Sequence, residues 1–393
     1  MLIKIETNIE IKIESCELKS LIKVFLQVLS SVFESIVNQA LLHYYYEYLA
    51  DGTLNQLLQT DARIYQKSHS KLTKLKTLFG TIWIYQIQVK IGKRQKSITR
   101  LLLGVESRLQ IPIFMKEILA QIGALTTYRV GEKIIKMLSN FPISLMSIWR
   151  SVQIVASRLT LKEVQNGTNE YQADGTGIPT CGSGKRGSEL KVVYQTDTNG
   201  KLHLVGIAIG KYKDVKDWFS ALSSSLLAGI SKFGKVFLAS DCESSIINTA
   251  KSLAKEVYIQ IDLWHVFYQM KYYLWQDKVE KEIRNNIISL VYKIALVKTN
   301  LNVEKRIRIL KIIINSLISN NYTHTANYLT TSLEHFYTFE KEGNINKYTS
   351  KTERSMRTIN ARINVGVWSD AGAMNVSKIR IAHYYNGERA SFN

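Results

Sequence analysis

Two aspartates in this sequence stand where carboxylates could share a divalent cation. Asp174 closes a short segment, 170–174, that has strand character, and Gly175 follows it. Asp241 follows residues 235–240, a predicted strand with no charge after its first residue. A carboxylate at the end of a buried strand is costly to desolvate unless a cation or a donor meets it. Because Mg²⁺ prefers hard oxygen ligands and keeps several waters, two or three carboxylates suffice to hold it.

A third acid, Glu353, is the single acidic residue in a basic segment that is predicted to be helical. The neighbouring cations are Lys351, Arg354, Arg357 and Arg362. One interpretation is a basic amphipathic helix with a Glu353–Arg357 ion pair. The other is a metal-binding glutamate among arginines that grip phosphates. Each aspartate also has a simpler interpretation as a turn or capping residue, and Asp241 could cap the helix that begins at Ser244.

The elements around these acids predict an α/β fold. Strands are expected over 170–174, 190–196 and 202–209, the last two joined by the turn Asp197-Thr198-Asn199-Gly200. A helix over 215–230, a strand over 235–240, a helix over 244–254 and a strand over 257–261 follow. Three antiparallel strands, a helix and then strand–helix–strand is the order of an RNase H-like core. From about 266 to 345 helical spacing replaces the strands, which predicts an all-helical insertion.

The N-terminal part has a different organisation. A helical region over 18–58 precedes a strand expected over 77–89, in which Gly80 is a bulge or turn. A basic patch that includes Lys93 and Arg94 comes next, and three short helices are predicted over 115–125, 128–138 and 144–159, an arrangement that suits a helix-turn-helix. We predict three regions: 1–72, helical; 73–165, a strand segment with a DNA-binding helix-turn-helix; and 166–393, catalytic.

The third of these helices is the candidate for reading DNA. Helical spacing turns Ile148, Val152, Val155 and Ala156 inward and leaves Ser147, Arg150 and Ser151 on the outer face. Short polar and basic groups of this kind suit a DNA groove. An ordinary helical bundle with a solvated basic face remains the alternative.

Composition favours an anionic partner. The formal net charge of the 393 residues is +20, and nucleic acid is the commonest partner of so basic a chain. A membrane surface is the rival, but we expect no spanning segment, since no run of about 18 uninterrupted apolar residues occurs. Three cysteines without a CxxC pair indicate neither a disulfide framework nor a structural zinc site, so a reducing cytoplasm is expected.

Two other patterns do not support a different chemistry. The glycine-rich segment 182–187 lacks the Lys-Ser/Thr pair of a phosphate-binding loop, and we interpret it as a hairpin tip whose Lys185 and Arg186 contact DNA. The seven histidines show no HExxH or zinc-finger spacing, which leaves zinc hydrolysis unsupported.

In their order, these residues resemble the DDE transposases of prokaryotic insertion sequences of the Mutator-like type. The likeness is carried by Asp174-Gly175, Asp241, the segment Asp262-Leu263-Trp264-His265, and Glu353-Arg354, with Trp368, Gly372-Ala373-Met374 and Ile379-Arg380 in the tail. It covers about 171–380, and the N-terminal third only by general layout.

The resemblance implies a Mg²⁺-dependent enzyme, in which Mn²⁺ can substitute, that cuts transposon ends and transfers the 3′-OH strand to target DNA. Asp174, Asp241 and Glu353 would be the catalytic and metal-binding triad, and Asp262 and His265 a second tier at the edge of the site. It further implies binding to terminal inverted repeats, a homodimer or higher oligomer on DNA, and a bacterial or archaeal, nucleoid-associated location. The alternatives are an inactive or domesticated DNA-binding protein, and an RNase H-like nuclease without strand transfer.

Overall fold

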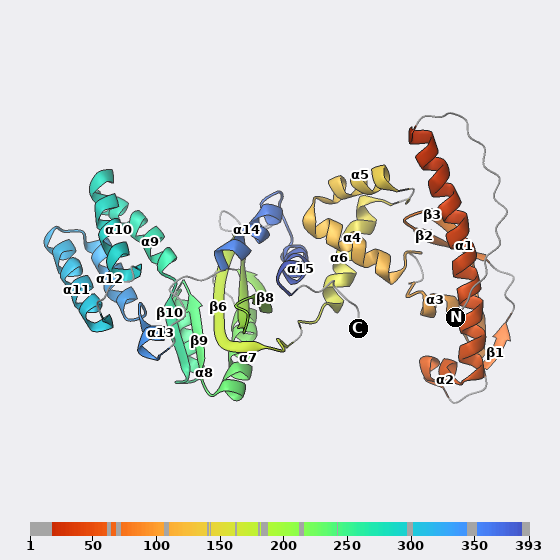
Figure 1. Cartoon of the computed structure of the whole chain (residues 1–393), viewed down its shortest axis with the longest axis horizontal. Coiled ribbons are helices and arrows are strands. Elements are labelled where there is room, and N and C mark those ends of the chain that lie inside the picture. The colour runs from red at the N-terminus through yellow and green to blue at the C-terminus, as the bar shows by residue number, and fades with distance from the viewer. Residues whose placement is uncertain are drawn as a thin grey trace. The chain divides into compact units, whose positions relative to one another are not determined.

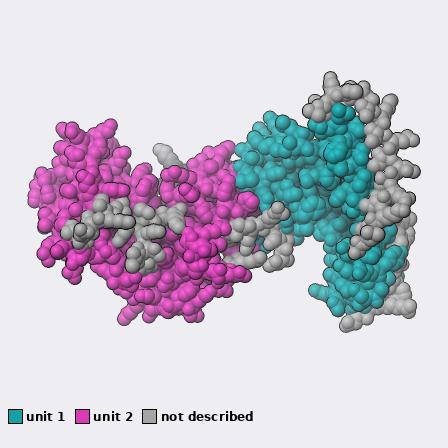
Figure 2. Space-filling model, in the orientation of Figure 1, with its two compact units in different colours: residues 1–159, 390–393 teal, residues 160–389 magenta. Residues whose placement is uncertain are grey.

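The computed structural model describes residues 18–60, 64–67, 72–105, 110–139, 141, 143–161, 163–179, 181, 188–211, 216–241, 243–296, 302–343 and 352–386 (Figure 1). Contacts divide the chain into two compact units, one of residues 1–159 with 390–393 and one of residues 160–389 (Figure 2). We call them the N-terminal and C-terminal units and describe each by itself.

The N-terminal unit opens with helices followed by short strands. A three-stranded sheet has the order β1-β4-β5, and β2 and β3 form a separate antiparallel hairpin. The strand expected over 77–89 is therefore wrong as a single element. Thr77 pairs with Gly80 across a two-residue turn, and the φ of 134° at Gly80 explains why the chain reverses there. The elements are α1 (Leu18–Ala50), α2 (Thr53–Leu58), β1 (Ile64–Lys67), β2 (Leu72–Thr77), β3 (Gly80–Tyr85), β4 (Gln88–Ile91), β5 (Arg94–Ser97) and α3 (Ile98–Leu102).

Helix α1 corrects one expectation about membranes. By length and composition alone, its segment Leu21–Ala50 is apolar enough to cross a bilayer, although scattered polar residues interrupt the run. In this fold, however, Leu41 and Tyr45 of α1 are buried in the core of the unit. The side chain of Asn38 also bonds the backbone of β3, accepting from Tyr85 N at 2.8 Å and donating to Trp83 O at 2.9 Å. The part of α1 that carries Asn38, Leu41 and Tyr45 is thus packed into the N-terminal unit.

Three further helices of the N-terminal unit agree with the sequence prediction: α4 (Ile113–Leu125), α5 (Tyr128–Leu138) and α6 (Leu145–Arg158). The side chains of Thr127 and Ser144 cap α5 and α6. The inward residues Ile148, Val152, Val155 and Ala156 of α6 are buried, as expected. Gly123 allows α4 and α6 to approach closely, because a Cβ there would lie 2.8 Å from Val152 Cγ2.

The C-terminal unit is built on a mixed five-stranded sheet of order β10-β9-β6-β7-β8. Strands β6, β7 and β8 are antiparallel, whereas β9 runs parallel to β6 and β10 parallel to β9. The α/β class and the predicted order of strands and helices are confirmed. The elements are β6 (Gly167–Ile178), β7 (Ser188–Asp197), β8 (Leu202–Lys211), α7 (Lys216–Phe233), β9 (Val236–Ser240), α8 (Ser244–Leu253) and β10 (Val257–Ile261).

The two faces of the sheet are covered differently. On one face Tyr171 and Ala173 of β6 join a core with Leu222 and Leu226 of α7 and Ile246 of α8. Since side chains alternate along a strand, Gln172, Asp174 and Thr176 face the other side. There α14 (Thr352–Ile363) packs against β6, and α15 (Asp370–Ile381) packs against α14 (Figure 1).

Between β10 and α14 the described chain is helical, which agrees with the predicted insertion, although the first helix begins at Leu263 rather than near 266. Its helices share a hydrophobic core that includes Val266, Met270, Val291, Leu310 and Leu329. They are α9 (Leu263–Gln276), α10 (Lys281–Leu296), α11 (Val303–Ser319), α12 (Thr323–Leu333) and α13 (Thr338–Lys341). A π-helical turn, Ala382–Asn386, follows α15.

Candidate metal centre

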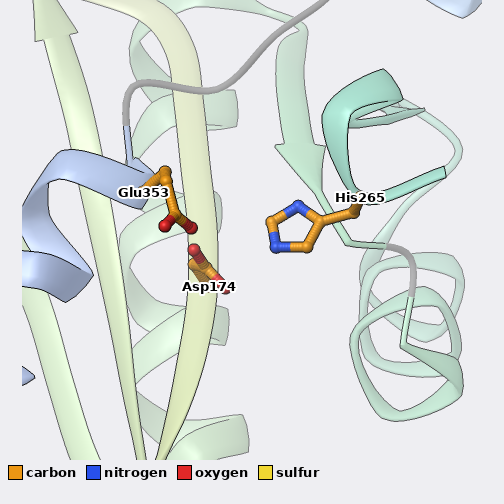
Figure 3. A group of neighbouring side chains, drawn as sticks. All are labelled: Asp174, His265 and Glu353. Atoms are coloured by element: carbon orange, nitrogen blue, oxygen red, sulfur yellow. The ribbon is translucent and has the colours of Figure 1, made fainter. Parts of the chain in front are cut away.

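Three side chains from distant parts of the sequence meet at one point of the C-terminal unit. Asp174 of β6, His265 of α9 and Glu353 of α14 each offer one ligand atom, and these atoms lie within 4.8 Å of one another (Figure 3). Asp174 is only 3% exposed, while His265 and Glu353 are partly buried. Two carboxylates and an imidazole at this spacing could hold a metal ion.

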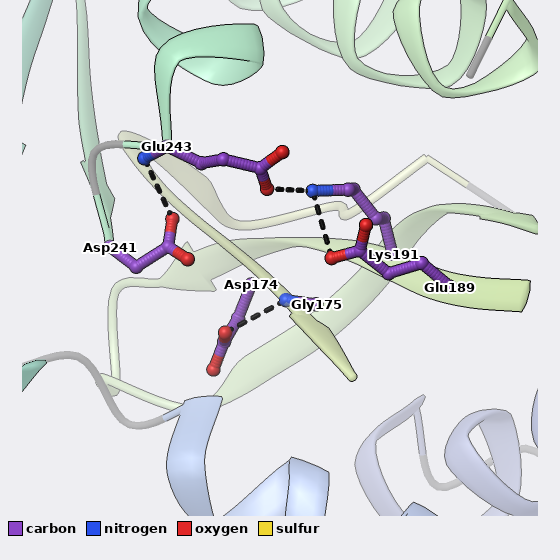
Figure 4. A network of polar contacts seen from close by, with 6 residues as sticks. All are labelled: Asp174, Gly175, Glu189, Lys191, Asp241 and Glu243. Carbon is purple, nitrogen blue, oxygen red and sulfur yellow. Dashed lines mark hydrogen bonds and ion pairs between the residues drawn. The ribbon is translucent and has the colours of Figure 1, made fainter. Parts of the chain in front are cut away.

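The position of Asp174 follows from strand register. Asp174 lies within β6, opposite Val192 of β7, and not at a strand end as the sequence had suggested, because β6 continues to Ile178. Gln172 pairs in parallel with Ala239 of β9, so the same register two residues further on brings Asp174 level with Asp241. Asp241 lies just beyond the end of β9, as predicted, beside Asp174 (Figure 4).

Asp241 lies outside the 4.8 Å group but is electrostatically coupled to it. Burial raises the pKa of Asp241, while a backbone N–H and the charges of His265 and Lys191 oppose that shift. Its charge also acts on the pKa values of Asp174 and His265. The structure therefore brings Asp174 and Glu353 together, with Asp241 as their neighbour on the adjacent strand.

The carboxylate of Asp174 has one satisfied and one unsatisfied oxygen. Oδ1 accepts a hydrogen bond from Gly175 N at 2.8 Å. Oδ2 is buried and accepts none from any residue that the structure describes. Burial, with a smaller contribution from the charge of Asp241, raises the pKa of Asp174 to about 6. A buried, unpartnered carboxylate oxygen fits a cation as its missing partner.

His265 is held by Asp262, the other residue of the Asp262-to-His265 segment. Asp262 caps α9 by accepting from Trp264 N at 3.0 Å, and its other carboxylate oxygen lies 3.3 Å from His265 Nδ1. Burial would lower the pKa of His265, but the bond to Asp262 and the charges of Asp174 and Asp241 outweigh it and raise the pKa to about 9. We predicted a second-tier role for His265 at the edge of the site, whereas the structure places its ring in the cluster itself.

Glu353 both forms the ion pair with Arg357 and lies in the candidate metal cluster. Its carboxylate lies 3.5 Å from Arg357 Nε, one turn along α14, and also beside Asp174 and His265. Helix α14 is fixed to the sheet by a bond between Ser355 and Tyr194 of β7, and by one of 3.1 Å from Thr176 of β6 to Asn360. The ion pair does not turn Glu353 away from the cluster.

A buried lysine beside the cluster was missed by sequence reasoning. Lys191 of β7, 1% exposed, forms ion pairs with Glu189 at 3.1 Å and with Glu243 (Figure 4). Glu243 N in turn donates to Asp241 Oδ1 at 3.1 Å, so Asp241 bonds the residue that precedes α8 rather than the helix itself. Burial opposes the charge of Lys191, but its carboxylate partners raise its pKa above the usual value.

The glycine after Asp174 serves this same network. A Cβ at Gly175 would lie 2.7 Å from Glu189 Oε1. The structure shows that the space is taken by the carboxylate of Glu189, which pairs with Lys191.

The predicted DNA-contacting residues divide into exposed and buried ones. Exposed are Lys93, Arg94, Arg150, Arg354 and Arg357, and Ser147 is partly buried. Two expectations are wrong: Ser151 is buried and donates to Ser147 O, and Arg362 is buried with its guanidinium 4.6 Å from the centre of the Trp368 ring. Ser151 adjoins Val152 on the side of α6 that packs inward, and Arg362 is used by the packing of α14. Lys185 and Arg186 lie outside the described residues.

Comparisons with known proteins give little further information. No family model matches the sequence, and no curated protein matches it. A solved structure described as "Drosophila P element transposase strand transfer complex" aligns with 74% of this chain and 83% of that chain, at 11% identity and a TM-score of 0.30. Similarity at this level carries no argument, so the functional inference rests on the site.

Replacing Asp174 by Asn should stabilise the metal-free protein at pH 7, by on the order of 2 to 3 kcal/mol, because it removes a buried charge. The raised pKa means that folded wild-type protein holds the Asp174 proton more tightly than unfolded protein. The stability that Asp174 contributes is therefore complete below pH 3.8, and it is lost as the pH rises to about 6. Denaturant unfolding across this range should show the loss in wild type and not in Asp174→Asn.

Asp197→Asn is the control with the opposite sign. Although burial acts to raise it, the pKa of Asp197 is lowered by His203 and by backbone N–H groups, so the stability contributed by Asp197 is lost as pH falls. Mg²⁺ or Mn²⁺ should raise the melting temperature of wild type and of Asp197→Asn, but not of Asp174→Asn. Parallel pH curves for wild type and Asp174→Asn would contradict this account of the buried carboxylate.

Replacing Lys191 by Met should lower the free energy of unfolding by roughly 1 to 3 kcal/mol, because it leaves two partly buried carboxylates without their cation. Adding Glu189→Gln and Glu243→Gln should recover part of the loss, since the uncompensated charges are then gone. Lys201→Met, at an exposed position of the adjoining turn, is the control and should change stability by about 0.5 kcal/mol or less. Equal effects of the two lysine substitutions would disprove the role of Lys191.

Proposed function

We propose that this protein is a DNA transposase with an RNase H-like core, which cuts transposon ends and joins the freed 3′-OH to target DNA. The observation that carries the proposal is the convergence of Asp174 and Glu353, separated by most of the C-terminal unit in sequence, beside Asp241 on the neighbouring strand. Such a group of carboxylates suits metal-assisted phosphoryl transfer.

The sheet supports the RNase H-like assignment. Taken in chain order, its five strands lie in the order fifth, fourth, first, second, third, with the first three antiparallel and the last two parallel to the first. The sequence predicted this succession of elements. In this topology the first and fourth strands are neighbours, so the residues they carry at one edge share a site.

The residues present fit Mg²⁺, with Mn²⁺ as a substitute. Asp174, Asp241 and Glu353 would bind the ion through their carboxylate oxygens. Oδ2 of Asp174, which is buried without a hydrogen bond from a described residue, would be stabilised most by the ion. When bound, the metal would supply charge that activates the attacking oxygen and stabilises the leaving 3′ oxygen. The buried position of Asp174 excludes water and strengthens its interaction with a cation.

His265 has a separate role in this proposal. In the metal-free protein the pKa of His265 is raised to about 9, which favours the imidazolium at neutral pH, and we propose that the ring donates to DNA rather than binding the metal. Asp262 orients the ring through Nδ1, which leaves the other N–H to meet a phosphate oxygen of the DNA strand beside Asp174 and Glu353. The exposed Arg354 and Arg357 of α14 would contact phosphates on either side of the cut.

The remaining parts of the proposal concern DNA binding and assembly. Arg150 and Ser147 of α6 would contact the terminal inverted repeats, with Lys93 and Arg94 at the turn into β5 binding phosphates. Joining two ends requires two active sites, and so we propose a homodimer or larger assembly on DNA. A cytoplasmic, nucleoid-associated location in a bacterial or archaeal cell agrees with a net charge of +20.

The triad is tested by end cleavage and strand transfer with Mg²⁺, on a plasmid that carries the inverted repeats flanking this gene. Asp174→Asn, Asp241→Asn and Glu353→Gln should each reduce cleavage by at least about 100-fold, the size of loss expected for a group that stabilises transition-state charge. Each variant should still bind the ends. Glu163→Gln, at an exposed acid of the same unit, is the control and should leave both reactions unchanged.

The outcomes separate the alternatives. Cleavage that survives in Asp174→Asn and Glu353→Gln rules out the triad. Metal-dependent cutting without joining would make the protein a nuclease, and end binding without any cutting would make it a DNA-binding protein.

Recognition by α6 is tested with Arg150→Ala. If Arg150 contacts a base edge, the substitution should weaken binding to the inverted repeat by roughly 1 to 3 kcal/mol and spare binding to a scrambled duplex. Arg308→Ala removes the same charge from an exposed site on α11 and is the control. Equal affinities of Arg150→Ala and wild type for the inverted repeat would disprove the recognition role of α6.

A further inference from the structure

Helix α9 carries two opposite stripes of side chains. Leu263, Val266, Met270 and Leu274 are fully buried and anchor the helix in the core of the insertion. The other stripe is aromatic and exposed, with exposed fractions of 43%, 62%, 51% and 62% at Trp264, Tyr268, Tyr272 and Trp275. The helix is therefore fixed on one side and presents aromatic rings on the other. Large exposed apolar patches usually mark a binding surface.

The exposed rings are ordered with respect to one another. Trp264 and Tyr268 lie with their centroids 5.8 Å apart and their planes at 10°. Tyr272 and Trp275 are stacked at 6.2 Å and 29°. Spacings of three and four residues put all of them along one side of the helix. We call this row the aromatic ladder.

Cations accompany the aromatic ladder. A hollow of about 580 Å³ is lined by Tyr268, Tyr272 and Trp275 together with Gln269, Lys271 and Arg284. Both charged residues of this lining are basic. A surface that offers aromatic faces and positive charge in the same groove matches a single nucleic-acid strand, whose bases stack on rings while its phosphates meet Lys and Arg.

The place of the ladder connects it to the candidate metal centre. α9 begins directly after Asp262, and His265 of the metal cluster is flanked by Trp264, with ring centroids 5.4 Å apart. The aromatic row starts at this end and continues along α9, which leads from the sheet into the insertion (Figure 1). A DNA strand that leaves the metal cluster can therefore follow the aromatic ladder along α9.

We propose that the aromatic ladder binds unpaired nucleotides of a DNA strand, whose bases stack on Trp264, Tyr268, Tyr272 and Trp275 while Lys271 and Arg284 hold its phosphates. That the strand comes from a DNA end at the metal centre rests on the proposed function. The binding of single-stranded DNA does not, because it requires no catalysis. The surface is indifferent to base sequence, since every base has a face that can stack.

A second copy of this chain fits the ladder less well. Symmetric pairing of the hollow would bring Lys271 and Arg284 against their own counterparts, with no acidic residue among the described residues of the lining to balance them. Like charges opposed at an interface are unfavourable. The phosphates of a nucleic-acid strand supply the missing negative charge.

The test measures binding of the full chain to a fluorescent oligothymidylate, in EDTA so that no cleavage occurs, with a mixed-sequence duplex measured in parallel. The double variant Trp264→Ala/Tyr268→Ala should lose about 5- to 100-fold in affinity for the oligothymidylate and less than about 2-fold for the duplex. Trp264→Phe/Tyr268→Phe keeps the ring faces and should restore most of the affinity. Binding should also quench tryptophan fluorescence in wild type.

Tyr46→Ala is the matched control, since Tyr46 is 54% exposed on α1 of the other unit, and it should bind like wild type. Thermal melting of each variant checks that the protein still folds. Unchanged oligothymidylate affinity in the double Ala variant, or an equal loss for the duplex, would refute the proposal. So would a concentration-dependent dimer of wild type that the double Ala variant abolishes, which would assign the ladder to a second copy.

Asp174→Asn makes the two proposals distinguishable. It should bind the oligothymidylate as wild type does while failing to cut transposon ends. Loss of strand binding only in the aromatic variants, in a protein that never cuts DNA, would keep the ladder and reject the transposase. If the protein cuts DNA fully and the aromatic substitutions leave its oligothymidylate affinity unchanged, the transposase is kept and the ladder is rejected.

Discussion

The buried carboxylate of Asp174 is the constraint on which the rest of the site depends. It lies within a central strand, has one oxygen without a hydrogen bond from any described residue, and is electrostatically coupled to Asp241 on the next strand. Water solvates such a group well and a protein interior solvates it poorly, so the fold must supply either a proton or a cation. The raised pKa of Asp174 shows that the surrounding residues alone compensate its charge only in part.

The surrounding elements can be understood as a response to that constraint. The helical insertion has its own hydrophobic core, which makes α9 rigid enough to hold His265 beside Asp174. Hydrogen bonds between Ser355 and Tyr194, and from Thr176 to Asn360, fix α14 to the sheet and so keep Glu353 at the same point. Lys191 stands on the far side, where it pairs with Glu189 and Glu243 and, through Glu243 N, fixes the position of Asp241. Three segments far apart in sequence are needed to complete one small centre.

Much of this could be predicted from the sequence, because local patterns determine it. Helical spacing gave α4 to α6 and the helices of the insertion, and the Asp197–Gly200 turn gave the β7–β8 hairpin. What the sequence did not reveal depends on contacts between distant residues. Lys191 and Glu189 alternate like solvent-facing strand residues, yet Lys191 is buried and pairs with the partly buried Glu189 and Glu243. Glu243 lies 52 positions from Lys191 in the chain. Ser151 and Arg362 were assigned to exposed faces by residue type, whereas the packing of α6 and α14 covers them.

The distribution of charge explains why a metal would bind where it is proposed and not in the neighbouring acidic network. Glu189 and Glu243 already share the ammonium of Lys191, and Asp262 shares the imidazolium of His265. In each of these pairs a cation of the fold already lies against the carboxylate, although Glu189 Oε2 is buried without a hydrogen bond from a described residue. Asp174 and Asp241 form no ion pair with a described residue, although the charge of His265 acts to lower the pKa of both. Glu353 pairs with the exposed Arg357, whose attraction solvent weakens. We therefore propose that a divalent ion binds at these three carboxylates, with the buried, unbonded Oδ2 of Asp174 as one of its ligands.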